Sequence, residues 1–159
     1  MKTKEELIDW LKDAYAMEKA MEMALGKQIN NDKVSQRMRE QASIHYTETQ
    51  GHAQAVHDCL HALGADVSLL KNMAAQGLEF AKSSTSMLAR DERVKDAIAA
   101  YASEHFEIAC YTALRTAAKT LGIAPIVSMC DAILKEETAM AEWLGSNLPN
   151  LVNDYLAEK

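Results

Sequence analysis

The chain has 159 residues, of which 48% are hydrophobic, with only six glycines and two prolines, and this composition predicts one helix-rich globular domain over residues 1–159. Its formal net charge is −6 and it has no cluster of lysine or arginine, so nucleic acid is not an expected partner. The charged amino terminus and the lack of a long apolar run argue against a signal peptide and a membrane span, and we expect a cytoplasmic protein.

Two helices are predicted in the first half of the chain. Thr3 and Glu6 form a capping box for a helix that ends near Gln28. A second helix is predicted from about residue 32 to Leu63, with Gly64 as its stop. Because the segment between the two helices is short, we expect them to lie antiparallel.

A long crossover is predicted next, over residues 65–90, which hold a short apolar stretch and then the polar sequence SSTS. A third helix is predicted from about Asp91 to Leu121, ending at Gly122.

The fourth helix is predicted to open at Pro125 and to stop before Pro149, followed by a short terminal helix from Leu151 to Ala157. Two helical hairpins joined by one long crossover have the ferritin-like connection. The predicted fold is therefore an all-α, ferritin-like four-helix up-down bundle with a short C-terminal helix.

Each of the four main helices carries glutamate near its middle, on the face predicted to be buried. Steps of three and four residues place these glutamates in line with the apolar positions of the same helix. They are Glu18, Glu48, Glu104 with Glu107, and Glu137. Burying an ionised carboxylate costs on the order of several kcal/mol. A bound proton, an oppositely charged partner or a cation is needed to offset this cost.

The sequence therefore predicts a metal site in the core. Carboxylate and imidazole ligands suit iron and manganese, and we expect two such ions, bridged by Glu48 and by Glu104 or Glu137. His45 and His52 share the predicted face of Glu48, and each is either a ligand or a group that holds a ligand in position. The alternative is a polar core without metal, in which carboxyls, histidines and tyrosines satisfy one another.

The three cysteines, Cys59, Cys110 and Cys130, are odd in number and widely spaced. This pattern predicts neither a disulfide framework nor a zinc pair. Reduced, buried thiols are expected instead.

Four stretches make the chain resemble the YciE/YciF family of small bacterial ferritin-like proteins, and within it YciE. They are DAYAMEK at 13–19, HYTET at 45–49, EHFEIACYTAL at 104–114 and AILKEETAMAEWL at 132–144. The resemblance implies a ferritin-like bundle, homodimers, a link to stress responses and a di-metal site.

The chain departs from the usual ferritin-like pattern in its histidines. Di-iron bundles carry Glu-x-x-His on two helices, whereas Gly51 and Met140 stand three residues after Glu48 and Glu137. His45 and His52 could then supply nitrogen to one ion, which would leave the second ion with carboxylates only.

Three functions are consistent with the sequence. The first is a di-metal protein that reacts with oxygen or peroxide, and the second is a metal-binding or storage protein without turnover. The third is a metal-free helical dimer that acts as a structural or partner-binding stress protein.

Overall fold

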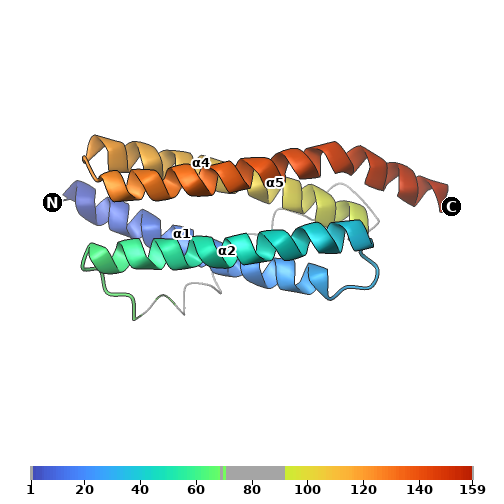
Figure 1. Cartoon of the computed structure of the whole chain (residues 1–159), viewed down its shortest axis with the longest axis horizontal. Coiled ribbons are helices and arrows are strands. Elements are labelled where there is room, and N and C mark those ends of the chain that lie inside the picture. The colour runs from blue at the N-terminus through green and yellow to red at the C-terminus, as the bar shows by residue number, and fades with distance from the viewer. Residues whose placement is uncertain (1, 69, 71–91, 159) are drawn as a thin grey trace.

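The computed structural model describes residues 2–68, 70 and 92–158 (Figure 1). Within these ranges there are four long helices and no strand. The helices are α1 (Lys2–Ile29), α2 (Gln36–Ala62), α4 (Glu92–Thr120) and α5 (Ala124–Ala157). The apolar and polar stretches predicted within the crossover fall largely outside the described residues.

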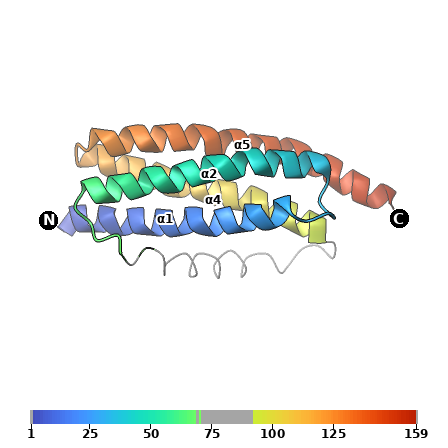
Figure 2. The ribbon, with the colours of Figure 1, turned by 60° about the horizontal axis from the view of Figure 1, so that its bottom comes forward.

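The helices form two antiparallel pairs, α1 with α2 and α4 with α5, and the pairs contact each other through α1 with α4 and α2 with α5. The end of α2 lies beside the start of α1, whereas α4 starts at the opposite end of the bundle (Figures 1 and 2). The connection from residue 63 to residue 91 therefore joins opposite ends, and α2 and α4 run in the same direction. The predicted ferritin-like four-helix bundle is confirmed.

Local signals fix the helix ends. The Ser35 hydroxyl accepts a hydrogen bond from the Met38 amide at 3.3 Å, so α2 begins after Ser35, a few residues later than predicted. Gly64 and Gly122 have φ of 75° and 70°, a left-handed backbone that glycine adopts without steric cost. Their predicted role as helix stops is confirmed.

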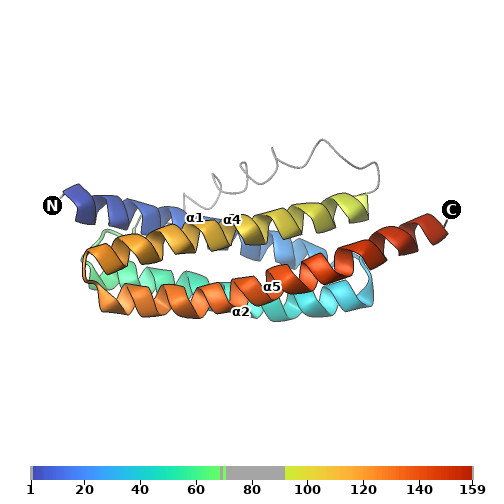
Figure 3. The same cartoon turned by 90° about the horizontal axis from the view of Figure 1, so that it is seen from above.

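The predicted break before Pro149 is wrong, because α5 continues through Pro149 to Ala157 and no separate C-terminal helix exists. A proline removes one backbone donor and bends a helix, but two contacts made by residues that follow Pro149 anchor the last part of α5. Leu151 packs against the apolar cluster that precedes the proline, and Arg93 of α4 forms an ion pair with Glu158 at 2.7 Å. Figure 3 shows that the end of α5 extends beyond the other three helices.

Apolar clusters occupy both ends of the bundle interior. One contains Leu7, Leu11, Leu60 and Ile126, and the other contains Met38 and Met140. The polar side chains described next lie between them. None of the described helices is long and apolar enough to cross a membrane.

Candidate metal centre

Six ionisable side chains, contributed by all four helices, meet in the middle of the bundle. Each is at most 4% exposed. They are Glu18 from α1, His45 and His52 from α2, Glu104 and Glu107 from α4, and Glu137 from α5. Their predicted burial is confirmed.

Glu137 lies at the centre of this cluster. Its Oε2 is 3.5 Å from Nε2 of His45, and its Oε1 is 2.9 Å from Nδ1 of His52. The same His45 nitrogen is 3.2 Å from Glu104 Oε1, and the same His52 nitrogen is 3.5 Å from Glu18 Oε1. One carboxylate thus links two pairs, each made of a histidine and another glutamate.

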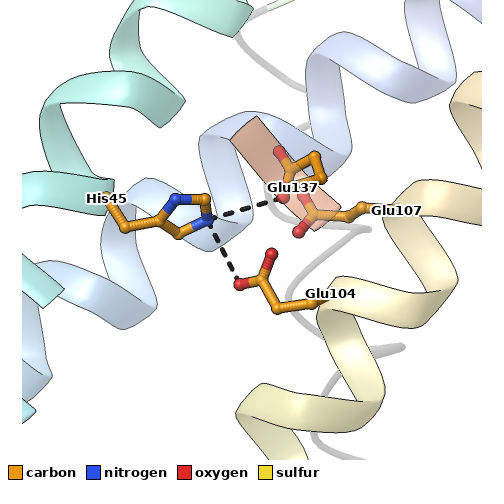
Figure 4. Close-up of side chains that lie close together, drawn as sticks. All are labelled: His45, Glu104, Glu107 and Glu137. Atoms are coloured by element: carbon orange, nitrogen blue, oxygen red, sulfur yellow. Dashed lines mark ion pairs between the residues drawn. The ribbon is translucent and has the colours of Figure 1, made fainter. Parts of the chain in front are cut away.

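Ligand atoms converge in two groups that share Glu137. His45, Glu104, Glu107 and Glu137 form the first group, and their side chains point toward one another in Figure 4. Glu18, His52 and Glu137 form the second. In each group the candidate ligand atoms lie within 4.8 Å of one another.

Each histidine is held from outside the cluster by a further carboxylate. Nδ1 of His45 lies 2.8 Å from Oε2 of Glu48, and Nε2 of His52 lies 2.6 Å from Oε2 of Glu136. These contacts fix the ring orientation and leave the other ring nitrogen facing the cluster. Histidines that bind metal are held by carboxylates in the same way.

Two sequence-based expectations need correction. Glu48 does not face the core, because its side chain is 31% exposed and contacts the outer nitrogen of His45, so it cannot bridge two ions. The histidines do not serve one group together, since His45 belongs to the first group and His52 to the second. Neither group is made of carboxylates alone.

The histidine pKa values reflect their carboxylate partners. Burial acts to lower the pKa of His45, but contacts with Glu104 and Glu137 outweigh it and raise the pKa to about 11. Burial likewise acts to lower the pKa of His52, whereas contacts with Glu137 and Glu18 raise it to about 10.

The carboxylates divide by their contact with these rings. Burial acts to raise the pKa of Glu137, but the contacts with both histidines lower it below its usual value. Burial raises the pKa of Glu104 to about 8 despite its contact with His45. For Glu107, burial and the charges of nearby glutamates raise the pKa well above the usual value.

The cluster leaves many polar atoms unsatisfied. Within the described part of the chain, twelve buried side-chain nitrogen and oxygen atoms have no hydrogen-bond partner, and nine of them belong to these six residues. They include both oxygens of Glu104, Glu107 and Glu137, which lie near imidazoles without being aligned for a hydrogen bond. Native proteins leave few such atoms, and oxygen and imidazole donors of this kind suit iron or manganese. The residues fit a metal.

Comparisons with known proteins identify the family of the chain. Residues 2–157 match the family model described as a domain of unknown function, DUF892. The chain is 31% identical to protein YciF of Escherichia coli strain K12, over 87% of this chain and 86% of that protein. The chain belongs to the YciE/YciF family.

Two solved structures share the fold of this chain. A crystal structure of a Xanthomonas campestris protein superposes with a TM-score of 0.82 at 30% identity, covering 99% of this chain and 98% of that one. The crystal structure of the E. coli stress protein YciF gives a TM-score of 0.71 at 27% identity, covering 96% and 99%.

Glu136 and Thr49 were not predicted as parts of the site, whereas a hydrogen bond between a core tyrosine and a carboxyl was among the sequence-based expectations. Glu136 contacts His52, and the Tyr111 hydroxyl, which is fully buried, donates to Glu18 at 2.5 Å. Thr49 is 1% exposed, its hydroxyl has no partner, and it lies one turn from each histidine. The spacing of Thr49 from His45 and His52 was the signal available for it in the sequence.

Proposed function

We propose that this protein binds two divalent ions, iron or manganese, in the two groups that share Glu137. The observation that carries the proposal is the set of nine unsatisfied buried atoms converging on one region. Leaving them without a cation would cost about 1 to 3 kcal/mol for each isolated group.

Charge supports the same conclusion. The cluster holds four carboxylates, those of Glu18, Glu104, Glu107 and Glu137. Two divalent ions would neutralise the charge of these four carboxylates. Both imidazoles can then stay neutral, and the neutral form is the one that binds metal. A buried site with no net charge has the lowest desolvation cost.

The residues of the chain have separate roles in this proposal. His45 and His52 provide the nitrogen donors, and Glu48 and Glu136 hold their rings. Glu137 faces both groups. Bound iron or manganese would supply Lewis-acid and redox chemistry toward oxygen or peroxide, and the apolar clusters at both ends of the interior would keep bulk water away.

The test is metal content followed by reactivity. Protein purified without chelators and then titrated with Mn²⁺ under anaerobic conditions is expected to hold two ions per chain. Glu18→Gln should lose Mn²⁺, whereas Glu22→Gln should not. Glu22 is the matched control because it lies on the same helix but forms an ion pair with Lys19. Peroxide consumption by the iron-loaded protein would separate turnover from storage. Absence of binding, or equal binding by both variants, would refute the proposal.

A metal-free core is the second candidate, and the short contacts of His45 and His52 with the buried carboxylates are the observation that favours it. With the pKa values of His45 and His52 raised to about 11 and about 10, two imidazolium ions can balance two carboxylates while Glu104 and Glu107 keep their protons. In that case the protein would be a structural or partner-binding stress protein. A melting temperature that Mn²⁺ and Fe²⁺ leave unchanged would select this candidate.

The family resemblance supports two further parts of the proposal. It favours a homodimer as the assembled state, and its link to stress favours a role under such conditions. We also propose a cytoplasmic location. Size-exclusion chromatography with light scattering tests the homodimer, and cell fractionation tests the cytoplasmic location.

A further inference from the structure

A second group of metal-binding side chains lies apart from the carboxylates, where α2 approaches its end and α5 begins. It consists of Cys59 from α2 with Met129 and Cys130 from α5. Cys130 is fully buried in the larger apolar cluster, and Cys59 and Met129 pack against that cluster. The Cys59 thiol donates to the Met129 sulfur at 3.4 Å.

The register of the bundle places Cys59 and Cys130 at the same level along its axis. His52 of α2 and Glu137 of α5 are in contact at 2.9 Å, and these two neighbouring helices run antiparallel (Figure 1). Cys59 follows His52 by seven residues, and Cys130 precedes Glu137 by seven. Both steps are two helical turns, about 10 Å, in the same direction along the bundle. Burial raises the pKa of Cys130 to about 12, and the neighbouring Cys59 thiol contributes to this shift.

The donor set differs from that of the carboxylate cluster. Two thiols and a thioether are soft ligands, which select Cu(I) rather than iron, manganese or magnesium. Structural zinc takes four ligands, whereas this group supplies three sulfur atoms. Cys59 is only partly buried, so an ion can reach the site from solvent.

We propose that Cys59, Met129 and Cys130 form a binding site for one monovalent soft metal ion, Cu(I). Coordination releases the two thiol protons to solvent and transfers no electron, so the two thiolates and the one Cu(I) ion together carry a net charge of −1. The site is independent of the di-metal proposal, since it shares no residue with the carboxylate cluster and lies about two helical turns from it.

The test uses the full-length protein, reduced and kept anaerobic, titrated with Cu(I) in competition with a coloured Cu(I) chelator. We expect one ion per chain, with a thiolate-to-metal absorption band in the ultraviolet. Cys59→Ser should weaken Cu(I) binding by at least about 100-fold. Loss of a side chain that only supports a metal ligand already weakens binding by up to about 100-fold, and Cys59 is proposed as a ligand itself. Met129→Leu keeps the volume and removes the sulfur, and it should weaken binding by roughly 10-fold.

Cys110→Ser is the matched control, because Cys110 is a partly buried cysteine on α4 outside the sulfur group, and it should bind as the wild type does. Circular dichroism of each variant establishes that it is folded. Cu(I) left entirely with the chelator by the wild type, or equal binding by Cys59→Ser and Cys110→Ser, would overturn the proposal. Mn²⁺ binding by Cys59→Ser is expected to be unchanged, so failure of this site and failure of the di-metal site are separate results.

Discussion

Glu107 offers the sharpest separation of a metal centre from a polar core. Its side chain is 1% exposed and neither oxygen has a hydrogen-bond partner, and burial beside other glutamates raises its pKa, which favours the protonated form in the metal-free protein. A buried polar group without a partner costs about 1 to 3 kcal/mol. Glu107→Leu replaces it with an apolar side chain of similar size, so the metal-free variant should gain about that much free energy of unfolding.

In a chain of this length each kcal/mol is worth about 2 to 4 °C in melting temperature, so the gain is measurable by thermal melting after chelation. Mn²⁺ should stabilise the wild type by an amount that increases with the Mn²⁺ concentration. The variant should lose this stabilisation. The matched variant is Glu137→Leu. It should lose the same Mn²⁺ response but destabilise the metal-free protein by about 3 to 5 kcal/mol, because it removes the buried partner of two charged histidines.

The two variants are therefore expected to respond in the same way to metal and in opposite ways without it. A metal-free Glu107→Leu that melts below the wild type would show that Glu107 is satisfied in the core. Combined with a wild type that ignores Mn²⁺, that result would refute the di-metal proposal.

Three further predictions concern pH, ring orientation and hydrogen bonding. The folded-state pKa values of His45, His52 and Glu104 are about 11, about 10 and about 8, and each exceeds the value in the unfolded chain. The folded protein therefore holds more protons than the unfolded chain between pH 6.5 and 8. The chelated protein should lose stability over this range, by up to about 1.4 kcal/mol per pH unit for each extra proton held. A urea midpoint that is flat or rises over this range would contradict the assignment. Glu136→Gln should weaken Mn²⁺ binding by about 10-fold to 100-fold, and equal affinity to an exposed control, Glu142→Gln, would show that Glu136 does not support the site. Tyr111→Phe removes the donor to Glu18 and should lower the free energy of unfolding by about 1 to 3 kcal/mol; an unchanged urea midpoint would argue against that bond.

The fold could be predicted because its signals are local. The glycines at 64 and 122 and the proline at 125 mark where helices stop and start, and the steps of three and four residues show which face of each helix is buried. The path of α5 through Pro149 could not be predicted in this way. The end of α5 makes contacts with residues far away in sequence, such as the ion pair between Glu158 and Arg93, which are 65 residues apart.

The six core residues could be predicted from the same steps, but the role of Glu48 could not. On α2, steps of three and four residues lead from His45 to His52 in two ways. One passes through Glu48 and the other passes through Thr49. Charge favoured Glu48 as a ligand, whereas the structure turns Thr49 inward and Glu48 outward toward Nδ1 of His45. A difference of one residue is a rotation of about 100° on a helix, and only packing against the other helices decides it.

The two groups around Glu137 are unequal. The first contains three carboxylates and the second contains two, with Glu137 common to both. An ion in the first group would experience the larger negative charge, so that position should fill first and should favour the more highly charged oxidation state of the metal. Loading should therefore proceed in two resolved steps, and a half-loaded protein should hold its ion beside His45, whose imidazole signals would shift in an NMR titration before those of His52.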